Sequence, residues 1–170
     1  MMQAARTMVE ALEQAAARHD RGFTHVAMDG TSCFESFHEL HRRAVRIGNA
    51  LRQQGVAKGD RVGLILSESQ QFTAGLFGIF MAGAVAVPLA SPSVRYGQSG
   101  AFLRHLAPPI VKARPRLLLA DEALVPVLAA ASTEFRLPPA LSLDALLRDV
   151  PDDATGESCS IGPAIPSRLR

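Results

Sequence analysis

The sequence is poor in lysine and cysteine, two residues that frequently mark phosphate and zinc sites. It has two lysines, Lys58 and Lys112, and two cysteines, Cys33 and Cys159, with no second Cys or His at metal-ligand spacing. It also lacks a Gly-x-x-x-x-Gly-Lys-Ser/Thr run, a Gly-x-Gly-x-x-Gly run after a strand, and a Gly-x-Ser-x-Gly elbow. These absences exclude the common nucleotide-binding loops and the glycine-flanked activated serine, and they suggest neither a zinc site nor a disulfide framework.

Charge is nearly balanced, with 18 Lys+Arg against 16 Asp+Glu and a formal net charge of +2. The basic residues are scattered rather than clustered, so we expect no nucleic-acid partner. Residues 1–19 contain no continuous apolar stretch of the kind found in secretory signals, which predicts a cytoplasmic protein. A length of 170 residues, 48% of them hydrophobic, suffices for one domain with a substantial core.

Residues 69–94 contain no charged side chain. Because ~20 apolar residues are enough to span a bilayer, a small membrane-associated protein is one alternative. However, Gly75, Gly78, Gly83 and Pro88 interrupt the run, and no Lys or Arg cluster flanks it. We therefore expect no membrane span here, but a buried helix followed by a buried parallel strand.

Capping-box spacing predicts the starts of three helices, because a Ser or Thr and a Glu or Gln three residues later can bond free amides of the first turn. These starts are Thr7–Glu10, Ser36–Glu39 and Ser67–Gln70. We expect the three helices to end near His19, Gly55 and Ala82, respectively. The second is the clearest, because its apolar residues recur at steps of three and four, at Phe37, Leu40, Ala44, Ile47 and Leu51.

Strands alternate with these helices. We expect them at His25–Asp29, Val62–Leu66, Ala84–Leu89 and Arg116–Ala120. A turn is predicted at Asp29-Gly30. The alternation predicts an α/β fold with a mostly parallel sheet flanked by helices.

Three further helical segments are predicted in the second half of the chain. The first covers 101–106 and is broken by Pro108-Pro109, the second is a short helix capped by Asp121 that runs to Ala131, and the third is Ser142–Leu147. Residues 151–170 have no periodicity and are dominated by Pro, Gly, Ser and Asp, which indicates an unstructured tail. We therefore expect residues 1–150 to form the ordered part of the chain.

One group of side chains has the composition of a metal site. His38 and His41 lie three apart on a predicted helix, with Glu35 and Glu39 beside them. No second Glu-x-x-His occurs to complete such a site, so a solvated helix face is the favoured interpretation.

The remaining candidates have simpler interpretations. Asp60-Arg61 could form a catalytic pair, but its place between Gly59 and a strand favours a turn aspartate followed by an exposed arginine. Both lysines are interpreted as surface charges. Cys33 is either a small buried hydrophobic residue or a reactive thiol. The segment Gly97-Gln98-Ser99-Gly100 has no basic partner nearby and more plausibly shapes a loop than binds phosphate. No catalytic, cofactor-binding or metal-binding residue is assigned from the sequence.

Three segments occur in a recognisable order: Phe37–Leu40, Gly59-Asp60-Arg61-Val62 and Ala82–Leu89. In this order they resemble the opening of the adenylate-forming superfamily, which contains acyl-CoA synthetases, fatty acyl-AMP ligases and peptide-synthetase adenylation domains. Residues 102–106 and 115–119 look most like the fatty acyl-AMP ligase branch, from which Pro108-Pro109 departs. The resemblance implies that residues 1–150 are the N-terminal part of an AMP-dependent synthetase/ligase domain.

The family resemblance also implies ATP and Mg²⁺ as cofactors and a carboxylic (fatty) acid as substrate for the full-length enzyme. Its catalytic motifs follow the segments found here, and the first, a phosphate loop with lysine, would be expected after Pro151-Asp152-Asp153. The sequence there reads Ala154-Thr155-Gly156-Glu157 instead. Adenylation needs donors for the phosphates, a metal and an oriented acid. We therefore expect a truncated fragment that binds no cofactor and is inactive alone, from a frameshifted or split gene.

An alternative is a non-catalytic subunit that completes its fold on a partner chain. The sequence specifies neither the acyl substrate nor the acceptor, which is CoA or a carrier protein in this superfamily.

Overall fold

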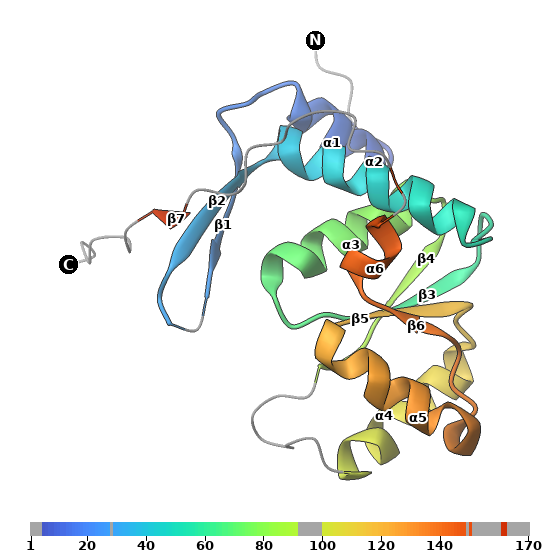
Figure 1. Cartoon of the computed structure of the whole chain (residues 1–170). Helices are drawn as coiled ribbons and strands as arrows, with labels where there is room; N and C mark the ends of the chain where they lie inside the picture. The colour runs from blue at the N-terminus through green and yellow to red at the C-terminus, as the bar shows by residue number, and fades with distance from the viewer. Residues whose placement is uncertain (1–4, 28, 92–99, 149, 151–160, 163–170) are drawn as a thin grey trace.

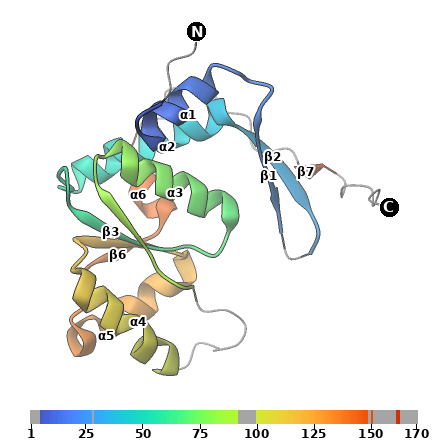
Figure 2. The same cartoon turned by 180° about the vertical axis from the view of Figure 1, so that it is seen from behind.

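The computed structural model describes residues 5–27, 29–91, 100–148, 150 and 161–162. A parallel sheet lies at its centre between two layers of helices, and an antiparallel hairpin projects beside one of these layers (Figure 1). Figure 2 shows the same three layers from behind. The predicted α/β fold, with a mostly parallel sheet flanked by helices, is confirmed.

The parallel sheet has the strand order β4-β3-β5-β6. Its strands are β3 (Arg61–Ile65), β4 (Val85–Pro88), β5 (Leu117–Ala120) and β6 (Ala140–Leu141). Both neighbours of β3 pair with it in parallel, and β6 pairs in parallel with β5. The three longer strands were predicted to within a residue or two, whereas β6 was missed because two residues are too short to show a hydrophobic period.

One face of the sheet is covered by four helices: α1 (Met8–Ala16), α2 (Phe37–Gln53), α3 (Ser69–Met81) and α6 (Leu143–Leu147). The apolar stripe predicted for α2 is buried here, and Leu40, Ile47 and Leu51 have no solvent exposure. The capping box at the start of α2 is formed as predicted. The Ser36 hydroxyl accepts from the Glu39 amide, and the Glu39 carboxylate accepts from the Ser36 amide at 2.8 Å.

The opposite face is covered by α4 (Gly100–Ala113), a short 3-10 turn (Glu122–Leu124) and α5 (Val125–Phe135). Strand β5 contributes to both cores, because Leu117 and Leu119 pack into the first and Leu118 into the second. A parallel strand that is covered on both faces has no polar side, which explains the unbroken apolar run from Leu117 to Ala120.

Helix α4 is longer than predicted, because it continues through Pro108 and Pro109 to Ala113. The prediction that the two prolines break the helix is therefore wrong. Both prolines are exposed, whereas Leu106 and Ile110 are buried against the sheet. Burial of that apolar face compensates for the two amide donors that the prolines remove.

Two other local predictions need correction. The third capping box is absent: α3 begins at Ser69 with Glu68 as its N-cap, and no side chain caps it. Strand β4 is parallel as expected, but it is not buried. It lies at the edge of the sheet, and Val85 is 49% exposed.

The hairpin consists of β1 (Gly22–Val26) and β2 (Ser32–Ser36), paired antiparallel. The first strand was expected at His25–Asp29 and begins three residues earlier, and β2 was not predicted. The turn at Asp29-Gly30 is confirmed, since Asp29 Oδ1 accepts from the Thr31 amide at 2.9 Å and Gly30 has a φ of +83°.

Within the tail 151–170, the structure describes only Ile161–Gly162. They form the short strand β7, which pairs antiparallel with β2. The rest of that tail lies outside the described residues. Among the described helices, none is both long and apolar enough to cross a bilayer.

Candidate functional site

The carboxyl ends of β3 and β5 meet at a point where the chain turns in opposite directions. After β3 the chain continues through α3 to β4 on one side, and after β5 it continues through α5 to β6 on the other. The two helices also cover opposite faces of the sheet. Such a reversal opens a crevice outside the strand ends, and ligands of open α/β sheets typically bind there.

Asp121 occupies this position, directly after β5. Its carboxylate accepts hydrogen bonds from the Ser67 amide at 3.0 and 3.2 Å and from the Ser91 hydroxyl at 3.1 Å. Ser67 follows β3 and Ser91 follows β4, so one carboxylate connects the ends of three strands. Asp121 is the N-cap residue of the short turn that follows, as expected, but its side chain makes no capping bond.

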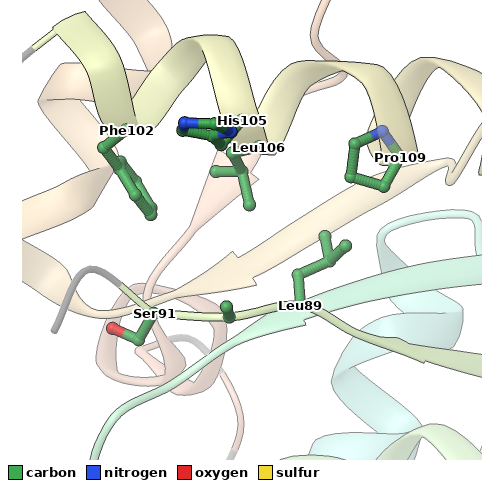
Figure 3. Close-up of a pocket in the computed structure, with 7 residues that line it drawn as sticks. Leu89, Ser91, Phe102, His105, Leu106 and Pro109 are labelled. Carbon is green, nitrogen blue, oxygen red and sulfur yellow. The ribbon is translucent and has the colours of Figure 1, made fainter. Parts of the chain in front are cut away.

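A pocket of about 240 Å³ opens beside this cluster, between the end of β4 and helix α4 (Figure 3). Side chains of α4 point across it toward the strand. The residues that line it are Leu89, Ala90, Ser91, Phe102, His105, Leu106 and Pro109. Ser91 belongs to both features, because its hydroxyl bonds Asp121 and it lines the pocket.

The pocket is chemically suited to an apolar group. Its walls are mostly aliphatic and aromatic, and the Ser91 hydroxyl and the His105 ring are the polar side-chain groups among its described lining. No lysine or arginine occurs in that lining, so it offers no counter-charge for a triphosphate. Its size is below the ~300–1,000 Å³ typical of sites for drug-sized ligands, which favours a small ligand or one segment of a longer ligand.

The candidate metal group does not assemble. His38 stacks on His19 with ring centroids 4.2 Å apart, and the Glu39 carboxylate is used by the capping box. Glu35 points instead toward His25 and Arg43. Among the described residues, no group of three potential metal ligands is close enough to hold an ion.

The other sequence candidates behave mainly as structural residues. Asp60 accepts from the Ala57 amide at 2.9 Å, which confirms the turn aspartate, and the Arg61 side chain is exposed and donates to the Ala113 carbonyl. Both lysines are exposed. The segment Gly97–Gly100, apart from the backbone of Gly100 in α4, lies outside the described residues.

Cys33 lies partly buried on β2 and is disulfide-bonded, so neither of the two roles considered for it, nor the expectation of no disulfide, holds in this structure.

Sequence reasoning missed Ser91 and His25 as interacting residues. Ser91 lies 30 positions from Asp121, and His25 lies 44 positions from its partner Ser69. The local sequence pattern around these residues predicts neither contact, because both contacts depend on the tertiary fold. The signal available for Asp121 was its place directly after a buried strand, where parallel sheets gather functional side chains.

A model of the family described as AMP-binding enzyme matches residues 12–157 of this chain. The fatty acid–[acyl-carrier-protein] ligase of Streptomyces coeruleorubidus is 32% identical over 108 residues, which cover 58% of this chain and 20% of that ligase. This chain therefore spans about a fifth of the length of that relative.

The solved structures that are similar to this fold include the following two. McyG A-PCP, solved with phenylalanyl-adenylate, has a TM-score of 0.75 and 26% identity over 95% of this chain and 25% of its own. A structure from a study of fatty acyl-adenylate ligases of E. coli and L. pneumophila has a TM-score of 0.71 and 26% identity, covering 91% of this chain and 28% of its own.

Proposed function

We propose that this chain, which belongs to the AMP-binding enzyme family, is the N-terminal part of an ATP-dependent, carboxylate-activating ligase. The observation that carries the proposal is the family match over residues 12–157, which includes the whole parallel sheet. The similar proteins include a ligase named for fatty acids and a structure that holds an aminoacyl adenylate. The reaction class is thus activation of a carboxylate as its adenylate, with a fatty acid as the first substrate to test.

In this proposal the chain supplies scaffold and part of a pocket rather than the chemistry itself. The pocket beside α4 is apolar and suits the hydrocarbon part of an acid. The Asp121 cluster fixes the loops that follow three strands at the edge where ligands of such sheets bind.

ATP and Mg²⁺ are the cofactors that the family implies, but the described residues do not suit them. No group of three metal ligands is present among these residues, and no cation lines the described part of the pocket. The groups that would hold a triphosphate must therefore come from outside the described residues.

A non-catalytic subunit that completes its fold on a partner is the second candidate. The observation that favours it is the edge strand β4, which has a sheet neighbour on one side only among the described residues and whose Val85 is half exposed. Such an edge can accept a further strand. The expectations of a truncated or split gene and of a cytoplasmic location stay predictions.

The test compares two proteins in acid-dependent exchange of pyrophosphate into ATP. One is the 170-residue chain, and the other is the longer protein obtained when the downstream DNA is read on in the same or a shifted frame. We expect exchange from the longer protein with a fatty acid, and none from the chain alone. Downstream DNA without a Ser/Thr/Gly-rich loop ending in Lys-Gly, or exchange by the chain alone, would contradict the proposal.

A further inference from the structure

A serine, a histidine and a glutamate form a continuous hydrogen-bonded series between the hairpin and the start of α3. Ser69 Oγ lies 2.9 Å from His25 Nδ1, and His25 Nε2 lies 3.1 Å from Glu35 Oε2. Arg43 Nη1 donates to the other carboxylate oxygen, Oε1, at 2.6 Å. These four side chains come from α3, β1, β2 and α2, so the tertiary fold alone brings them together.

The proton positions in this series follow from the chemistry of its groups. A carboxylate held by an arginine can only accept, so His25 Nε2 must carry the hydrogen of its bond to Glu35. In the neutral imidazole, Nδ1 is then an acceptor, and the Ser69 hydroxyl donates to it. The imidazole is therefore oriented to take the serine proton, as a general base does.

The glutamate and the histidine of this series are shielded from solvent, whereas the serine is exposed. A nucleophilic serine with a general base needs this distribution. The Glu35 side chain is 1% exposed and the His25 side chain 10%, whereas Ser69 is exposed. The base and its partner are thus held in a fixed position away from water, and the hydroxyl remains accessible to a reagent.

The backbone around Ser69 supplies donors for a developing negative charge. Ser69 is the first residue of α3, which follows β3 after a short turn, and a strand–turn–helix junction also presents the nucleophile in α/β-hydrolases. The first amides of a helix have no intrahelical partner, and the side chain of the N-cap residue of α3, Glu68, makes no capping bond. Within the described part of the chain no capping bond occupies the amides of Gln70 and Gln71, so they can donate to an oxyanion formed at Ser69.

We propose that Ser69 is a nucleophile for acyl transfer from activated esters, with His25 as its general base and with Glu35 and Arg43 as positioning residues. Ser69 Oγ bonds to the acyl carbon while its proton passes to His25 Nδ1. The ester C–O bond then breaks, and the leaving alcohol takes the proton from His25. Water releases the acid from the acyl-serine by the same route. This site does not depend on the proposed ligase function.

The test uses an alkyl fluorophosphonate on the full 170-residue chain, followed by intact-mass measurement and peptide mapping. In this reaction the P–F bond breaks, an Oγ–P bond forms, fluoride leaves, and the serine proton passes to His25. We expect one adduct per chain, located at Ser69 and absent from Ser69→Ala. Ser132→Ala is the matched control, because its hydroxyl donates to the Ala129 carbonyl and touches no histidine; it should label like the parent chain.

The roles of His25 as general base and of Glu35 as positioning residue are tested by the rate of labelling. His25→Gln should slow labelling about 100-fold, the lower range of general-base catalysis, and Glu35→Gln should slow it by a smaller factor. Circular dichroism of each variant establishes whether it is folded. A folded parent chain that acquires no adduct at Ser69 overturns the proposal, and this outcome needs no variant. Labelling of Ser69 at an unchanged rate in a folded His25→Gln variant overturns it as well.

Discussion

Gly78 of α3 lies against Ile47 of α2 so closely that a Cβ atom on the glycine would come within 2.5 Å of the Ile47 Cβ. The approach is reciprocal, because a Cβ on Gly48 of α2 would lie 2.8 Å from the Met81 Cβ and 3.1 Å from the Gly78 carbonyl oxygen. Small residues at the crossing let the two longest helices of the first layer pack backbone against backbone. The two helices pack together in the core that covers this face of the sheet.

Gly78→Ala should destabilise the protein by about 1–3 kcal/mol, the usual cost of overpacking a core. This destabilisation should exceed the ~1 kcal/mol by which alanine is favoured over glycine in a helix. Gly75→Ala is the control on the same helix, because its new methyl would meet only the flexible ends of Leu64 and Leu66, at 3.0 and 3.2 Å. Urea unfolding of both variants measures the difference, and equal effects would show that the close approach is not limiting.

Asp121→Ala should lower the free energy of unfolding by about 1–3 kcal/mol, because it leaves the Ser67 amide and the Ser91 hydroxyl without their acceptor. Asp121→Asn keeps one acceptor oxygen and should cost less. Glu122→Ala, at an exposed neighbouring position, should change little. Thermal unfolding followed by circular dichroism ranks the three, and a harmless Asp121→Ala would mean that the strand ends are held by other contacts.

Val85→Lys should reduce self-association of the isolated chain. Val85 lies on the edge strand β4 and is 49% exposed, and a charge on an edge strand opposes pairing with another chain. Val111→Lys is the control, since Val111 is 47% exposed but lies on helix α4. Light scattering and the fluorescence of a hydrophobic dye report the effect. A monodisperse parent chain with a sharp thermal transition would remove the basis of this prediction.

The hydroxyl and amide of Thr31 hold the pKa of Asp29 below its usual range. The ionised form is thus favoured in the folded state, so this turn is stabilised above the ordinary carboxyl pKa of about 3.9, and the stabilisation is lost as the pH falls through the lowered pKa. Thr31→Ala should raise the pKa of Asp29, as followed by NMR titration, whereas Ser32→Ala should not. An unshifted pKa in Thr31→Ala would show that the amide alone is sufficient.

The sequence was most informative where local rules and burial agree. For α2, the Ser36 capping box and the apolar stripe from Leu40 to Leu51 point to the same helix, and the structure forms it. Strand β5 was predicted equally well, since a short run of four apolar residues is typical of a strand covered on both faces.

Errors arose where tertiary contacts outweigh local signals. Pro108 and Pro109 read as breakers, yet Ile110 anchors the helix beyond them. The candidate site was largely unpredictable for the same reason. The Asp121–Ser91 and His25–Ser69 contacts join residues that are distant in sequence, so only the folded chain shows them.

Helix α6 has a consequence for how the protein is made on the ribosome. Leu143 and Leu146 complete the same core as α1, α2 and α3, although the whole opposite helical layer is synthesised between them. The early helices therefore leave the exit tunnel with part of their apolar surface exposed to solvent. This surface stays exposed until about 60 residues beyond α3 have been translated. Docking of α6 is then a late, closing step of co-translational folding, and the nascent chain is most exposed to chaperones and proteases before that step.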